Sequence, residues 1–209
     1  SIDAAKAQWL TTGFTLVNAI MIPITAYLID RFATRSLFLV SMTLFTFGSA
    51  LAGWGPTFDV LLLGRLVQAA GAGVLMPMVM TVLMLTFPLE HRGVAMGLFG
   101  VVIAFAPAIG PTVAGIVIDT SSWHIMFYGI SILSFVVILV AIFSIDKIPA
   151  ARTAQKLDKL SVVLSTVGFG SLLYGFSVIG SYGFSLDCAI AIVLGSVVLV
   201  LFFKRQLSM

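Results

Sequence analysis

Arg65 is the side chain whose type and position best suit it to do chemistry. It is the only Lys or Arg well inside an apolar segment, residues 60–87, which is long enough for one helix to cross a bilayer. A charge at that depth is costly in lipid and therefore usually faces a polar interior, where it has a function. The alternative is that the apolar stem of Arg65 lies in the lipid and its guanidinium reaches the outer headgroups.

The helical period places small and polar residues beside Arg65. At 100° per residue, its face is shared by Gln68, Ala69, Ala72 and Met76. Because polar, small and flexible side chains suit the lining of a central cavity, we expect this face to line one. In the first apolar segment, Asn18 and Met21 are further cavity candidates, with contacts between helices as the alternative.

The composition indicates that these residues are positioned by elements that cross a membrane. The 209 residues are 60% hydrophobic and 9% charged, whereas soluble domains carry about 25% charged residues. Long apolar segments predict helices rather than a barrel, so the expected fold class is an all-α integral membrane protein. Seven segments are long enough to span, namely residues 7–29, 36–53, 60–87, 94–118, 124–145, 160–179 and 187–203.

Several classes of site do not fit this composition. No basic tract suits nucleic acid, and the single Cys188 allows neither an intramolecular disulfide nor a Cys-based metal site. We predict no catalytic residue, no metal and no cofactor. The sequence begins at Ser1 without a signal peptide, and we expect it to be cut from a longer protein.

The loop charges predict the orientation in the membrane. One set of alternate loops holds nine of the eleven basic residues, and the opposite set holds only Lys6. The nine are Arg31, Arg35, Arg92, Lys147, Arg152, Lys156, Lys159, Lys204 and Arg205. Since basic loops stay in the cytoplasm, we expect a multi-pass protein of the cytoplasmic membrane with its N-terminus outside and its C-terminus inside.

The fourth apolar segment has a surface of small residues. One helical face carries Gly93, Gly97, Gly100, Ala104, Ala108, Pro111 and Gly115, and a second row beside it carries Ala106, Gly110 and Ala114. Small residues four apart let helix backbones approach closely in lipid. Pro107 and Pro111 each remove a backbone donor. The pattern predicts a closely packed contact with another helix and a bend that a neighbouring helix or cavity uses.

The first polar break, residues 30–35, places Asp30 at the C-terminal end of a helix. An anion is unfavourable there, so this carboxylate needs a basic partner or the N-terminus of another helix. Arg31 and Arg35 are nearby in the chain. The alternative is an ordinary cytoplasmic turn with solvated charges.

Three stretches together resemble the major facilitator superfamily of transporters. AYLIDRFATRSLFL, residues 26–39, resembles the family's loop motif through Asp30, Arg31 and Arg35, although Ala26 and Ala33 replace its glycines. LLLGRLVQAAGAG, residues 61–73, resembles the fourth-helix motif through Leu61, Arg65, Gln68 and Gly71. APAIGPTVAG, residues 106–115, resembles the antiporter motif through Gly110, Pro111 and Gly115, with Ala106 and Ala114 in place of glycines.

The resemblance implies the fourteen-helix drug/proton antiporter branch of that family. Residues 1–145 would be helices two to six of the N-terminal bundle, residues 146–159 a basic cytoplasmic loop, and residues 160–209 two extra linker helices. The remainder of the transporter would lie outside this sequence. The implied activity is proton-coupled export of drugs or toxic small molecules by alternating access.

The family also implies roles and partners for these motifs. Proton coupling falls to Arg65, antiport to Gly110, Pro111 and Gly115, and conformational control to the loop motif Asp30, Arg31 and Arg35. The expected partners are protons, the lipid bilayer, the rest of the same transporter and a lipophilic small molecule, with cations among the candidates.

Other functions remain open on the sequence alone. An exporter of a metabolite, such as an amino acid or a sugar derivative, would share the fold. A seven-helix receptor or a structural membrane bundle would share the number of spans. A retinal protein would need a lysine inside its last span, and none lies in residues 187–203. We expect no enzyme, because both histidines lie near the interfaces and no GxSG motif is present.

Cysteine labelling tests the predicted orientation. In a Cys188→Ser background, Thr57→Cys and Ser121→Cys should react with an impermeant thiol reagent added to intact cells, whereas Ala154→Cys should not. Labelling of position 154 from outside would show that the predicted orientation is wrong.

Overall fold

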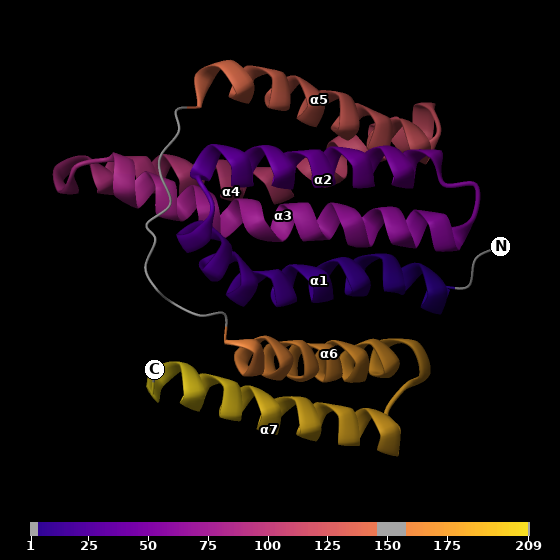
Figure 1. Ribbon diagram of the computed structural model, residues 1–209. Coiled ribbons are helices and arrows are strands. Elements are labelled where there is room, and N and C mark those ends of the chain that lie inside the picture. The colour runs from indigo at the N-terminus through magenta and orange to yellow at the C-terminus, as the bar shows by residue number, and fades with distance from the viewer. Residues whose placement is uncertain (1–3, 146–157, 209) are drawn as a thin grey trace.

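Seven helices make up the part of the chain that the computed structural model describes, residues 4–145 and 158–208 (Figure 1). They are α1 (Ala4–Arg31), α2 (Thr34–Trp54), α3 (Phe58–Thr86), α4 (Leu89–Thr120), α5 (Trp123–Ser144), α6 (Lys159–Tyr182) and α7 (Leu186–Ser208). These residues contain no strand, so the predicted all-α fold class is confirmed. Of the predicted basic loop, residues 146–157 lie outside the described residues.

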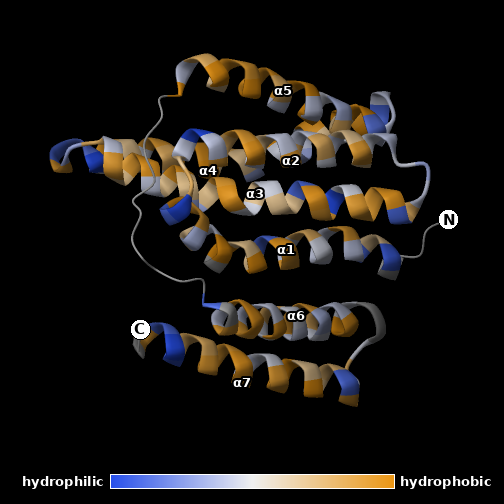
Figure 2. Cartoon of the chain, viewed as in Figure 1, coloured by the Kyte–Doolittle hydropathy of each residue, from blue (hydrophilic) through white to orange (hydrophobic). Residues whose placement is uncertain are grey.

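Helices α2 to α7 are each long and apolar enough to cross a membrane. Helix α1 adds a seventh span if its two parts, Lys6–Ile22 and Ile24–Arg31, are counted together across a bend of 48°. The bend falls at Pro23, where the chain lacks a backbone donor. Figure 2 shows apolar residues along most of each helix and polar residues mainly at the ends, with further polar positions inside α3.

The helices lie side by side in the order α5, α2, α3, α1, α6, α7 (Figure 1). Helix α3 packs between α2 and α1, and α6 joins this group through α1 alone. Helix α1 begins and helix α7 ends at opposite ends of the bundle, as an odd number of spans requires. Helix α4 makes only sparse contacts, with α3 and α5, and none of its residues is buried.

Glycines allow the backbones of α2 and α3 to touch. A Cβ added to Gly48 would lie 2.7 Å from Cα of Gln68, and one added to Gly64 would lie 2.5 Å from the backbone nitrogen of Ala52. Farther along, a Cβ on Gly71 would lie 2.7 Å from the backbone nitrogen of Phe45. Any larger residue at these positions would force the two helices apart, so the contact of α2 with α3 depends on glycine.

The small-residue face of the fourth segment makes no close contact with the residues that the structure describes, so its contact with another helix stays a prediction. A Cβ added to Gly93, Gly97, Gly100, Gly110 or Gly115 would have no heavy atom within 4 Å. Helix α4 runs unbroken through Pro107 and Pro111. Small side chains permit a close approach but attract no particular partner, and here the closely packed pair is α2 with α3.

Helices α6 and α7 form a hairpin with its own glycine contacts. A Cβ on Gly168 would lie 2.7 Å from Leu199, and one on Gly195 would lie 2.8 Å from the backbone nitrogen of Leu172. The turn between the helices begins at Gly183, whose φ of 81° favours glycine.

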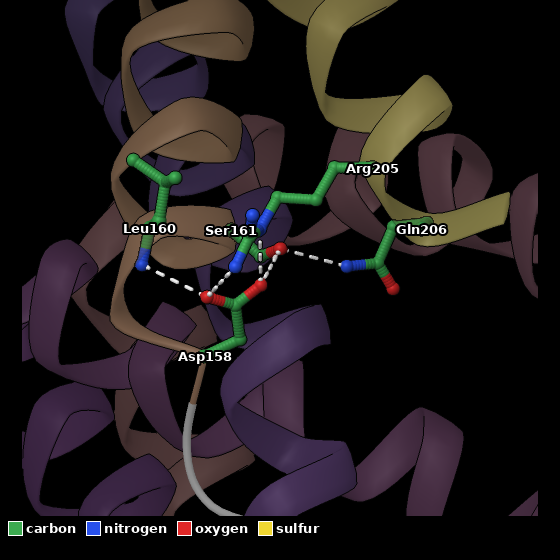
Figure 3. A network of polar contacts seen from close by, with 5 residues as sticks. All are labelled: Asp158, Leu160, Ser161, Arg205 and Gln206. Atoms are coloured by element: carbon green, nitrogen blue, oxygen red, sulfur yellow. Dashed lines mark hydrogen bonds and ion pairs between the residues drawn. The ribbon is translucent and has the colours of Figure 1, made fainter. Parts of the chain in front are cut away.

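The other end of this hairpin is closed by a polar network (Figure 3). Arg205 Nε donates to Oδ2 of Asp158 at 2.7 Å, the Ser161 hydroxyl donates to the same carboxylate, and Gln206 Nε2 donates to Ser161 Oγ at 2.8 Å. The hydrogen bond from Arg205, joined by that from Ser161, holds the pKa of Asp158 well below its usual range. The ion pair therefore stabilises the hairpin above the ordinary carboxyl pKa of 3.8 and is lost only well below it.

The glycine contact between α2 and α3 can be tested with one methyl group. We expect Gly48→Ala to lower the unfolding temperature of the purified protein, because overpacking costs roughly 1–3 kcal/mol. Gly100→Ala on the open face of α4 should leave the temperature unchanged or raise it, since alanine favours helix. Equal unfolding temperatures for the two variants would contradict the assigned contact.

Candidate functional site

Arg65 lies on α3 and is half-buried. Its Nη1 donates a hydrogen bond of 2.7 Å to Oε1 of Gln68, three residues later on the same helical face. No ion pair of Arg65 with a carboxylate is present among the described residues. Its charge is therefore solvated by a neutral side chain and is not cancelled there.

The hydrogen bonds continue from Gln68 into α2. Gln68 Nε2 donates to Ser49 Oγ at 2.8 Å, and the Ser49 hydroxyl donates to the carbonyl of Phe45 at 2.7 Å. Gln68 is 2% exposed and Ser49 is fully buried. The Ser49 hydroxyl accepts from Gln68 and donates to α2, so the network fixes the amide oxygen of Gln68 toward Arg65.

Aromatic rings from two other helices flank the guanidinium. Arg65 Cζ lies 4.3 Å from the ring centre of Phe14 on α1 and 5.9 Å from that of Phe127 on α5. Both distances are within the range of cation–π attraction. The sequence does not single out Phe14, Phe127 or Ser49, because nothing in the spacing distinguishes them among 17 phenylalanines and many serines.

The predicted face of α3 lies in several environments. Gln68 and Ala69 are buried, Ala72 is half-buried, and Met76 is 53% exposed. Asn18 and Met21 lie where α1 meets α3, since a Cβ on Gly73 would be 3.0 Å from Asn18 Oδ1 and 2.6 Å from Met21 Cβ. Their role in a central cavity stays a prediction.

The loop motif makes one contact across the bundle. Arg35, near the start of α2, donates to the carbonyl of Ile142 in the last turn of α5. A cation is favourable at a helix C-terminus and satisfies a carbonyl that has no partner within its helix. Asp30 and Arg31 end α1 and form no ion pair with any described residue. The negative charge of Asp30 thus stays at the C-terminal end of a helix, where it is electrostatically unfavourable, without a described ion-pair partner.

Part of the antiporter motif borders an apolar groove between α4 and α5. Ala106, Gly110 and Ala114 line it from α4, and Met126 and Gly129 line it from α5. Its volume is about 1140 Å³. Within the described ranges, no three His, Cys, Asp or Glu side chains lie close enough together to hold a metal ion.

Long apolar helices around a half-buried cation define the class as a multi-pass membrane protein. The Major Facilitator Superfamily is matched by residues 1–207, and the chain belongs to this family. It is a family of transporters rather than enzymes, which confirms the non-enzyme prediction and removes the receptor and structural-bundle alternatives.

Several relatives match most or all of this chain. It is 47% identical to the uncharacterized MFS-type transporter YcnB of Bacillus subtilis (strain 168), covering 100% of this chain and 44% of YcnB. It is 43% identical to the lincomycin resistance protein LmrB of the same organism, with the same coverage. It is 33% identical to the multidrug export protein EmrB of Haemophilus influenzae, over 80% of this chain and 33% of EmrB. The chain thus spans less than half the length of these relatives.

The Ser49–Gln68 hydrogen bond can be tested by a double-mutant cycle. Ser49→Ala leaves the buried amide of Gln68 without an acceptor and should cost about 1–3 kcal/mol of unfolding free energy. In a Gln68→Leu background the same change should cost much less, because no amide remains to be satisfied. Equal costs in both backgrounds, measured by thermal unfolding, would show that the two side chains do not interact.

Proposed function

We propose that the full transporter to which this chain belongs exports drugs or toxic small molecules in exchange for protons by alternating access. One observation carries the proposal. Arg65 holds a positive charge between helices, and its partners in the described residues are neutral groups. The names of two relatives, a lincomycin resistance protein and a multidrug export protein, support the choice of substrate class.

In this proposal, the positive charge of Arg65 acts electrostatically on a neighbouring carboxylate. A fixed positive charge favours the ionised form of a neighbouring carboxylate and so promotes proton release. That carboxylate belongs to the rest of the transporter or to the substrate. When it reprotonates, the attraction to Arg65 weakens, which links proton binding to rearrangement of the helices around α3.

Other parts of the chain have supporting roles in the proposal. The loop motif Asp30, Arg31 and Arg35 stabilises one conformation, with the partner of Asp30 in the rest of the transporter. The motif Gly110, Pro111 and Gly115 on α4 packs and gates against that same remainder. Residues 1–145 form a transport bundle and residues 160–209 a linker pair, in the cytoplasmic membrane with the N-terminus outside.

Substitution of Arg65 tests the proton-coupled mechanism. We expect Arg65→Ala in the full transporter to insert normally but to abolish uphill export of ethidium and lincomycin. Arg65→Lys should keep part of the activity, since lysine retains the charge but not the planar fork. Export is measured in cells without other drug exporters, with and without a protonophore, and Lys6→Ala in the exposed N-terminal turn is the control.

Two results would contradict the proposal. Normal protonophore-sensitive export by Arg65→Ala would show that its charge has no part in coupling. Export of amino acids or sugar derivatives, but of neither drug probe, would favour the metabolite exporter of the same fold.

A further inference from the structure

The guanidinium of Arg65 connects two helices that do not pack against each other. Phe14 comes from α1 and Phe127 from α5, and the backbones of these two helices do not lie against each other in the described structure. Both nevertheless place a ring beside the same side chain of α3. We propose that Phe14 and Phe127 are positioning residues that hold the charged group of Arg65 in place for proton exchange, an inference that rests on the proposed function.

The rings stabilise the charge without cancelling it. An aromatic face attracts a cation through its quadrupole, and the attraction is strongest where water is excluded. A carboxylate at the same place would neutralise the guanidinium. Of its five N–H donors, one is used on Gln68, and the described residues accept no other. The remaining N–H donors of Arg65 are therefore free to bind a carboxylate that takes up and releases a proton.

Each ring is carried by a helix that packs closely against a neighbouring helix. Gly13, directly before Phe14, lies against α3, because a Cβ there would be 3.0 Å from Leu66 and 3.5 Å from Leu62. Phe127 lies against α2, where a Cβ on Gly53 would be 3.1 Å from its Cβ. The ring of Trp123 meets that of Phe127 edge-on at 5.9 Å. A shift of α1 or α5 relative to α3 would therefore change the environment of the charge.

These two phenylalanines differ from others in the bundle. Phe14 and Phe127 are half-buried beside Arg65, whereas Phe135 on α5 is 53% exposed. Phe135 therefore provides a matched control on the same helix. A change that only loosened packing would affect stability, but it would not alter how export depends on pH.

The test measures ethidium export by the full transporter as a function of pH. Phe14→Leu removes the nearer ring face and should slow proton-driven export about tenfold. It should also move the pH midpoint upward, because a displaced guanidinium no longer favours the ionised carboxylate. Phe127→Leu should act in the same direction but less strongly, at its greater distance. Phe14→Tyr should restore normal behaviour, and Phe135→Leu should not change it.

Failure of this inference is distinguishable from failure of the proposed function. If Arg65→Ala abolishes export but Phe14→Leu and Phe127→Leu keep the normal pH midpoint, the positioning role is wrong and the transport mechanism stands. If Phe14→Tyr is as defective as Phe14→Leu, the aromatic face does not hold the guanidinium, because tyrosine keeps that face, and the positioning role is wrong. Normal coupled export by Arg65→Ala overturns both.

A second measurement does not depend on transport. In a double-mutant cycle of Phe14→Leu and Arg65→Met, unfolding temperatures of the purified protein should be non-additive, because the two side chains interact directly. Additive losses would overturn the contact even if Phe14→Leu proved too unstable for export assays.

Discussion

The charge of a guanidinium inside an apolar bundle must be stabilised by the side chains around it, from its own helix and from neighbouring helices. For Arg65 these are the amide of Gln68 and the faces of Phe14 and Phe127. The amide depends in turn on Ser49, which reaches it only because α2 and α3 touch at Gly48 and Gly64. Closeness of two backbones, set by glycine, is thus what makes a polar network possible beside the cation.

The two carboxylates at helix ends show opposite electrostatics. Asp158 accepts a hydrogen bond from Leu160 N at the start of α6, where an anion is favourable, and it is also paired with Arg205. Asp30 lies at the end of α1, where an anion is unfavourable, and pairs with no described residue. Stabilisation of the α6–α7 hairpin is enough to explain the position of Asp158. The position of Asp30 fits a residue that forms its pair only in one state of a larger molecule.

The apolar segments were sufficient to predict seven helices and their approximate ends, because bilayer thickness fixes the length of a span. The shared face of Arg65 and Gln68 followed from the helical period. Contacts between helices did not follow, since they depend on the rotation and height of each helix. The same small-residue spacing occurs at Gly48–Ala52 and at Gly93–Gly97, yet only the first pair meets another backbone. For the same reason, Phe14, Phe127 and Ser49 could not be selected from the sequence.

The α6–α7 hairpin has a consequence for how such a chain is assembled and how it evolves. Its glycine contacts at Gly168 and Gly195 and its Asp158–Arg205 pair are internal, and among the described residues it meets the other helices only through α1. A unit of this kind can enter the bilayer as two helices already folded together. It can also be gained or lost by a gene without repacking of α2, α3 or α5, so the number of spans can change in steps of two, and α1 is the helix whose packing must adjust.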